Sequence, residues 1–83
     1  MTYEIVFEPR ALDSAARFLE EDPSGLALVL DTIDKLADDP RPPASVPYGA
    51  PYLRRLRIGE YRVLYIIDDD VVHILVTHLG RTA

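Results

Sequence analysis

The chain has 83 residues, a length at which one small hydrophobic core holds a single domain together, so we predict one domain over residues 1–83. With 48% hydrophobic and 28% charged residues it has a globular composition, and its net charge of −5 argues against indiscriminate coating of nucleic acid. The absence of cysteine excludes disulfides and thiolate metal sites, and no apolar run approaches the ~20 residues of a membrane span.

The first half of the chain predicts one strand followed by two helices. Apolar and polar residues alternate over residues 2–8, which is typical of a half-buried strand. Over residues 10–21 the apolar residues recur every three or four positions and predict a helix. Asp22 and Pro23 suit an N-cap and a first helical position, so a second helix is predicted to begin there and to end by residues 38–40.

The second half predicts a loop and three strands. Residues 40–51 contain five of the seven prolines and are predicted to form a stiff loop without regular structure. Strand-like runs follow at about 53–58, 61–67 and 71–78, with connections short enough for antiparallel hairpins. The predicted fold is therefore α+β, in the order β-α-α-β-β-β, with both helices on one face of a small, mostly antiparallel sheet.

Positive charge is concentrated in the C-terminal half. Residues 1–40 carry three basic and ten acidic side chains, whereas residues 41–83 carry six basic and four acidic ones. Arg55 and Arg57 share one strand face, and Arg62 opens the next strand across a tight connection. Neighbouring like charges destabilise a sheet unless something compensates them, and a phosphate suits guanidinium groups. The alternative is a set of solvated side chains on an exposed face.

The two histidines are interpreted separately. His73 and His78 are five residues apart and lie on opposite faces of a regular strand, so no shared metal site is predicted. The ordinary pKa of histidine suits His78 for proton transfer near neutral pH, and a structural role is the alternative. The aspartates at 68–70 are interpreted as a solvated hairpin tip, and Glu60 is predicted to point to the other face.

The segments LRRLRIGEYRVLYIIDDD (53–70) and VVHILVTHLGR (71–81), in this order of elements, resemble the RelE/ParE superfamily of bacterial toxins, with the RelE-like branch favoured. The resemblance covers nearly the whole chain. It implies a cytoplasmic toxin of a toxin–antitoxin module, with a cognate RelB-like antitoxin that blocks the basic face. Contact with DNA is implied only through the toxin–antitoxin complex, and no membrane is involved.

Toxins of the RelE branch enter the ribosomal A site and cut messenger RNA without a metal. A ribose 2′-hydroxyl attacks the adjacent phosphate and leaves a 2′,3′-cyclic phosphate and a 5′-hydroxyl. The resemblance therefore implies a ribosome-dependent endoribonuclease, an mRNA interferase that inhibits translation. It implies no cofactor and no metal.

Four positions of this sequence match basic positions of the family and are predicted to be catalytic. Arg62 matches the arginine of the Tyr-Arg core that stabilises the pentacoordinate phosphate, and Arg81 resembles the arginine just after the last strand. Arg55 matches a basic residue of the preceding strand, and His78 matches the histidine of a His-x-x-Arg ending. Two further arginines are predicted to bind substrate: Arg54 and Arg57.

Two alternative functions stay open. One is a ParE-like protein that poisons DNA gyrase by binding it. The other is a weakly active or inactive relative that acts mainly through antitoxin binding and repression of its own operon. The acidic composition favours this second alternative, as does the lack of the tyrosine that many relatives carry after the last basic motif.

Overall fold

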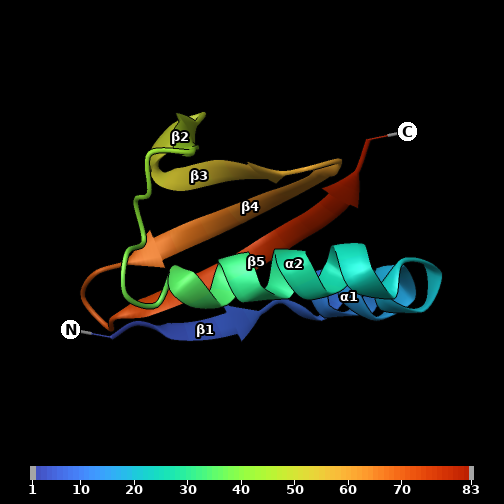
Figure 1. The fold of residues 1–83 in the computed structure, drawn as a ribbon. Helices are drawn as coiled ribbons and strands as arrows, with labels where there is room; N and C mark the ends of the chain where they lie inside the picture. The colour runs from blue at the N-terminus through green and yellow to red at the C-terminus, as the bar shows by residue number, and fades with distance from the viewer. Residues whose placement is uncertain (1, 83) are drawn as a thin grey trace.

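The computed structural model describes residues 2–82 and has two helices on one face of a five-stranded sheet (Figure 1). The elements are β1 (Glu4–Phe7), α1 (Pro9–Glu21), α2 (Pro23–Lys35), β2 (Ser45–Tyr48), β3 (Ala50–Ile58), β4 (Tyr61–Asp68) and β5 (His73–Arg81). The predicted α+β fold is confirmed. Among residues 2–82, no helix has the length and the apolar character needed to cross a membrane.

Each helix begins at a proline, whose fixed backbone angle suits the first helical position. α1 begins at Pro9 and α2 at Pro23. The carboxylate of Asp22 accepts a hydrogen bond from the backbone N–H of Gly25 at 3.2 Å, which confirms the predicted N-cap. A Cβ at position 25 would lie 2.1 Å from the Asp22 carboxylate, so this cap geometry requires glycine.

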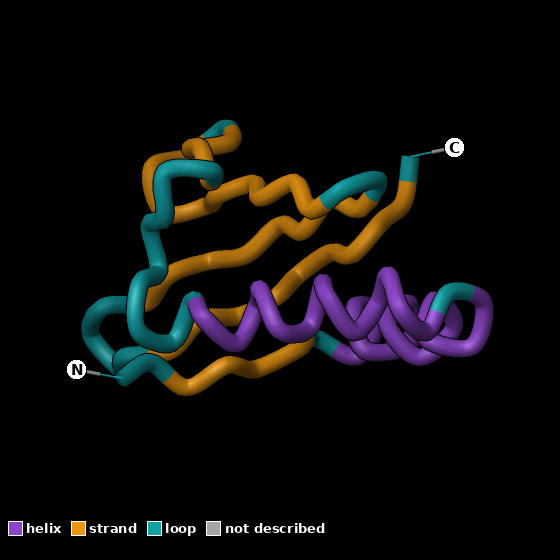
Figure 2. The backbone as a smooth tube through the Cα atoms, in the orientation of Figure 1, coloured by secondary structure: helices purple, strands orange, loops and turns teal. Residues whose placement is uncertain are grey.

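The sheet has the strand order β1-β5-β4-β3-β2. β1 runs parallel to β5, and the other neighbouring strands are antiparallel. Both helices lie on the same face, and side chains from that face of the strands complete the core (Figure 2). Within residues 2–82 the opposite face carries no helix, and it is the face on which Arg55, Arg57 and Arg62 lie.

The predicted loop at residues 40–51 is wrong in part. Residues 45–48 form β2 at the edge of the sheet, and β3 already begins at Ala50. An edge strand tolerates Pro47 because one side of its backbone pairs with no other strand. Gly49 has a φ of 84°, which supplies the left-handed turn between the two strands.

An irregularity in β5 corrects the predicted alternation of this strand. Leu64 pairs with His78 and Tyr65 pairs with Val76, so Thr77 is an extra residue opposite β4. The Thr77 hydroxyl donates a hydrogen bond to the Leu64 carbonyl at 3.2 Å. The extra residue reverses the alternation beyond it, so the two histidines of β5 lie on the same face of the sheet instead of on opposite faces.

Candidate functional site

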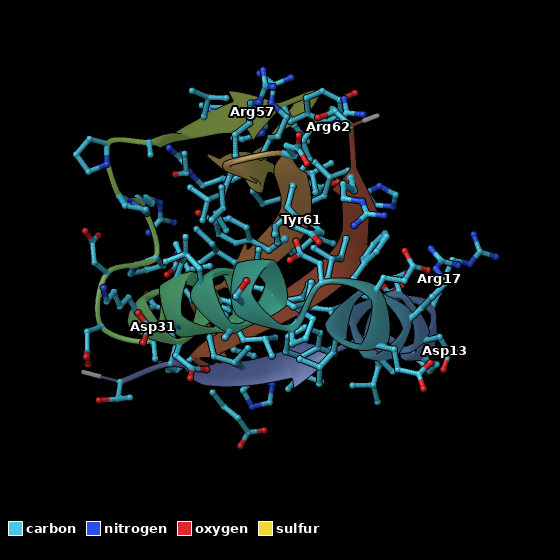
Figure 3. All side chains as sticks on the ribbon, turned by 45° about the vertical axis from the view of Figure 1, so that its right-hand side comes forward. Asp13, Arg17, Asp31, Arg57, Tyr61 and Arg62 are labelled. Carbon is cyan, nitrogen blue, oxygen red and sulfur yellow. The ribbon has the colours of Figure 1, made fainter. Side chains whose placement is uncertain are left out.

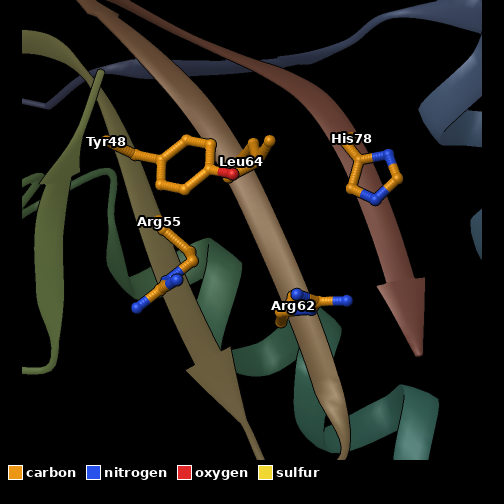
Figure 4. A pocket seen from close by; sticks show the side chains of 5 residues that line it. All are labelled: Tyr48, Arg55, Arg62, Leu64 and His78. Carbon is orange, nitrogen blue, oxygen red and sulfur yellow. The ribbon is translucent and has the colours of Figure 1, made fainter. Parts of the chain in front are cut away.

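A pocket of about 120 Å³ lies on the sheet face away from the helices (Figure 4). Its lining comes from four consecutive strands and consists of Tyr48, Arg55, Arg62, Leu64 and His78. Three of these residues, Arg55, Arg62 and His78, were predicted from the sequence to be catalytic. The structure therefore brings together three of the four predicted catalytic residues.

Strand register explains how residues far apart in the sequence meet in this pocket. Leu64 on β4 pairs with Arg55 on one side and with His78 on the other, forming one row across the sheet. Arg62 lies two residues before Leu64 on the same strand face. Cross-strand neighbours are about 5 Å apart, so the two guanidinium groups and the imidazole all border one small volume.

Gly80 makes room for the imidazole of His78. Position 80 pairs with Arg62 in the next row across the sheet. A Cβ at this position would lie 2.8 Å from the Nε2 atom of His78, closer than nonbonded atoms approach. The imidazole therefore extends over Gly80 toward the row of Arg62, and it does so because position 80 has no side chain.

The arginines on this face of β3 and β4 have no compensating partners within residues 2–82. No ion pair or side-chain hydrogen bond joins Arg55, Arg57, Arg62 or His78 to another group of this part of the chain. The Nε atom of Arg55 is buried and has no hydrogen-bond acceptor. Buried polar groups normally have a partner. An anion with several acceptor oxygens would satisfy this donor and compensate the neighbouring charges.

Arg57 lies beside the pocket but does not line it. It is exposed and pairs directly with Arg62 across β3 and β4, as the sequence predicted. Figure 3 shows both side chains at the end of the β3–β4 hairpin. Like charges directly opposite one another destabilise a sheet, which adds to the unbalanced positive charge at this end.

Arg54 is not brought into the pocket. Strand alternation places it on the opposite face of β3 from Arg55. Its Nε donates a hydrogen bond to the Ser45 hydroxyl at 2.8 Å, and its Nη2 donates to the Ser45 carbonyl at 3.0 Å. Arg54 therefore joins β3 to the edge strand, and it is not among the residues that line the pocket.

Arg81, the fourth residue predicted to be catalytic, is not among the residues that line the pocket. The alternation set by Thr77 turns its side chain toward the helices. Its Nη2 lies 2.9 Å from a carboxylate oxygen of Glu21, and its Nη1 donates to the Tyr61 hydroxyl at 3.3 Å. The guanidinium carbon is 5.2 Å from the centre of the Phe18 ring. The hydrogen bond with Tyr61 raises the pKa of Arg81, so this side chain stays charged in its position between α1 and β4.

Tyr48 is the pocket residue that sequence reasoning missed. It lies in the proline-rich segment that was interpreted as a loop, so it received no strand face. The signal that finds it is the alternation of Val46 and Tyr48 around Pro47, in which every second residue is apolar or aromatic.

Within residues 2–82, no group of three or more His, Asp or Glu side chains is arranged to hold a metal ion.

The side chains of Arg55, Arg62 and His78 in the pocket suit the chemistry of a phosphodiester. Two guanidinium groups provide donors for phosphate oxygens and stabilise negative charge that develops on them. The imidazole of His78 lines the same pocket, and imidazole is the side chain used most often for general acid–base catalysis.

Known structures share this fold over almost its full length. The isolated E. coli RelE toxin has a TM-score of 0.85 and 20% sequence identity, with 98% of this chain and 85% of that chain covered. A toxin from the Mycobacterium tuberculosis RelBE2 toxin–antitoxin complex has a TM-score of 0.82 and 23% identity, covering 98% and 99%. The archaeal RelE–RelB complex from Pyrococcus horikoshii has a TM-score of 0.82 and 22% identity, covering 98% and 96%. At these identities the likeness shows the fold.

The family follows from the sequence comparison. No curated protein sequence matches the chain. A family model described as the ParE toxin of type II toxin-antitoxin systems, parDE, matches residues 5–82, which is nearly the whole chain. The chain therefore belongs to the ParE toxin family of type II toxin–antitoxin systems, within the RelE/ParE superfamily.

Proposed function

We propose that the protein is an endoribonuclease toxin that cuts messenger RNA on the ribosome without a metal and so inhibits translation. The observation that carries the proposal is the convergence of Arg55, Arg62 and His78 on one pocket in which, among the described residues 2–82, neither arginine has an acidic partner. A fold gains no stability from such an arrangement by itself, so a phosphate ligand gives it a physical reason.

The proposed reaction is a transesterification within the RNA. The 2′-oxygen of a ribose bonds to the adjacent phosphorus, and the bond from phosphorus to the 5′-oxygen of the next nucleotide breaks. His78 in its neutral form accepts the proton of the 2′-hydroxyl, and the departing 5′-oxygen takes a proton from solvent. Arg62 and Arg55 donate hydrogen bonds to the nonbridging oxygens, whose negative charge grows in the transition state. The products are a 2′,3′-cyclic phosphate and a 5′-hydroxyl.

The proposed partners are a cognate RelB-like antitoxin, the ribosome and its messenger RNA, all in the cytoplasm. Two of the similar structures are complexes of a toxin with its antitoxin. An antitoxin segment that places acidic side chains over the pocket would compensate the arginines and exclude the phosphate. We propose that contact with operator DNA is made by the complex.

A second candidate function follows from the family of the chain, the ParE toxins of parDE systems. On this alternative the protein inhibits DNA gyrase by binding it, and the arginine-rich face is a docking surface without ribonuclease chemistry. The two candidates differ in one observable: only the first cuts RNA.

The test is induced expression in bacteria, with growth measurement and primer-extension mapping of messenger RNA, under active translation and with translation blocked. Arg62→Ala removes a pocket charge, and Arg10→Ala removes an exposed charge on α1 as a matched control. We expect growth arrest with translation-dependent cuts for wild type and Arg10→Ala, and neither for Arg62→Ala.

The other outcomes contradict the proposal in different ways. Arrest without RNA cuts favours gyrase as the target. No arrest, with the protein folded and present, favours an inactive relative that acts through antitoxin binding. Cuts that persist in Arg62→Ala place the ribonuclease site elsewhere on the molecule.

A further inference from the structure

We propose that Tyr48 forms, together with Arg55, a subsite for an unpaired nucleobase of the RNA next to the reacting phosphate. The inference rests on the proposed ribonuclease function and deepens it, because it assigns the part of the pocket that the phosphate chemistry does not use.

Tyr48 is a large aromatic residue at the open end of a cationic pocket. Its exposed fraction is 47%, although it is part of the pocket lining. Figure 4 shows the ring extending from the edge strand toward Leu64, on the side away from the helices. An exposed aromatic ring contributes little to the stability of the core. Its position in the pocket lining favours a role in binding a ligand.

Arg55 lies between this ring and Arg62, the residue proposed to bind the phosphate. Its guanidinium carbon is 5.6 Å from the centre of the Tyr48 ring, within the range of a cation–π contact. The contact places the guanidinium group over one face of the ring, so a base would stack on the other face. A base stacked on Tyr48 would therefore lie within reach of Arg55 while its own phosphate extends toward Arg62.

The order of groups across the sheet matches one nucleotide of single-stranded RNA. Tyr48 belongs to β2, Arg55 to β3, Arg62 to β4 and His78 to β5. Neighbouring strands are about 4.8 Å apart, so the strands that carry Tyr48 and Arg62 lie about two spacings apart, ~10 Å. The base and the phosphate of one nucleotide can contact residues on strands at that separation. Stacking on an aromatic ring beside a cationic groove is a general way to hold unpaired bases.

The experiment measures single-turnover cleavage of a short messenger RNA on purified ribosomes as a function of protein concentration. Tyr48→Ala removes the ring, and Tyr48→Phe keeps it without the hydroxyl. Tyr52→Ala is the matched control, because Tyr52 is 58% exposed on β3 and does not line the pocket. Each variant is assayed on intact RNA and on RNAs with one abasic nucleotide on either side of the cut.

We expect Tyr48→Ala to lower the second-order cleavage rate constant about 5- to 150-fold, the range of one lost base stack. We expect Tyr48→Phe and Tyr52→Ala to retain the wild-type rate constant within about twofold. Wild type should lose a comparable factor on one of the abasic RNAs. On that RNA, Tyr48→Ala should cause no further loss, because the base that stacks on the ring is already absent.

Three results would overturn the inference while leaving the ribonuclease function intact: an unchanged rate constant for Tyr48→Ala, an equal loss for Tyr52→Ala, or an equal loss on intact and abasic RNAs. The last of these would indicate that Tyr48 contacts the ribosome or orders the pocket instead of a base. Absence of any cleavage by folded wild type would overturn the proposed function and the inference with it.

Discussion

At the scale of single residues, the site depends on one glycine as much as on its charged groups. Gly80 has no positive φ, so its backbone accepts alanine without strain. The atom that an added Cβ would meet is the end of the His78 side chain, which can move. A substitution at position 80 therefore disturbs the imidazole while leaving the fold in place, which separates the two effects experimentally.

We expect Gly80→Ala to keep the wild-type melting temperature within about 2 °C and to lower the cleavage rate about 10- to 100-fold, because the displaced imidazole loses part of the 10²- to 10⁴-fold contribution of a proton-transfer group. The measurement is thermal unfolding beside single-turnover cleavage. In a His78→Ala background the same substitution should cause no further loss of rate. A full additional loss in that background would show that Gly80 acts independently of His78.

Arg62 should be important for activity and unfavourable for stability. We expect Arg62→Ala to lower the cleavage rate about 10²- to 10³-fold, as the loss of one preorganised donor to a developing oxyanion does. Because it removes the like charge opposite Arg57, we also expect the free energy of unfolding to rise by a few tenths of a kcal/mol. Urea unfolding and cleavage assays on the same preparation test both parts. A drop in stability that accounts for the lost rate would contradict this assignment.

At the scale of elements, the molecule separates Arg81 from the arginines that line the pocket. Arg81 at the end of β5 contacts Glu21 at the end of α1 and Tyr61 at the start of β4. The Tyr61 hydroxyl in turn donates a hydrogen bond to Asp22 at 2.9 Å, the residue that caps α2. Burial and this hydrogen bond raise the pKa of Tyr61, so the hydroxyl stays protonated as a donor. These contacts join both helices to the far end of the sheet.

We therefore expect Arg81→Ala to lower the urea midpoint of unfolding more than Arg10→Ala does. Cleavage by the folded fraction should stay within about threefold of wild type, since the residue does not touch the pocket. The measurement combines urea titration with cleavage at low temperature, where both variants are fully folded. A loss of rate as large as that of Arg62→Ala, without loss of stability, would return Arg81 to the catalytic group.

A second junction makes stability depend on pH. Asp69 in the β4–β5 turn accepts a hydrogen bond from the Tyr3 hydroxyl and pairs with Arg41 at 3.0 Å. These two contacts lower the pKa of Asp69 below its ordinary value of 3.8. The carboxylate thus stays charged to lower pH in the folded protein than in the unfolded chain. Its stabilising contribution is complete above the ordinary pKa and is lost as the pH falls through the folded value.

We expect Asp69→Asn to be less stable than wild type at neutral pH, with a difference that stays constant down to about pH 5 and closes below the ordinary pKa. Chemical denaturation at a series of pH values measures it. Asp70→Asn in the same turn is the control, because no side-chain hydrogen bond or ion pair of Asp70 is found among residues 2–82. A difference that is independent of pH down to pH 2 would contradict this account.

Features of this chain that depend on residues close in the sequence were predicted correctly, and features that depend on a partner strand were not. The strand at the N-terminus, the Asp22 cap and both helices depend on nearby residues, and all were predicted. Strand β2 was missed because a strand that contains proline is tolerated at the edge of a sheet, and the sequence alone does not show which strand lies at the edge. The extra residue Thr77 was missed because a bulge is defined by the partner strand. Because one extra residue reverses every later side chain, this bulge also decides which face of the sheet Arg81 occupies.

At the scale of the whole molecule, charge is divided between the two faces of the sheet. The chain has a formal net charge of −5, but the arginines of β3 and β4 that face away from the helices have no acidic partners in residues 2–82. A local field of this kind acts within about one Debye length, ~8–10 Å, of the surface. The acidic remainder limits nonspecific attraction to RNA, which is compatible with the proposed cleavage on the ribosome.

The most direct test of the ribonuclease account is the chemistry of the cut ends, determined on RNA fragments produced by the purified protein on programmed ribosomes. The account predicts 5′-hydroxyl ends, which polynucleotide kinase labels without prior phosphatase treatment, and 2′,3′-cyclic phosphates on the other fragment. It also predicts that Arg62→Ala produces neither. Fragments with 5′-phosphate ends, or intact RNA after incubation with folded wild-type protein, would contradict the account.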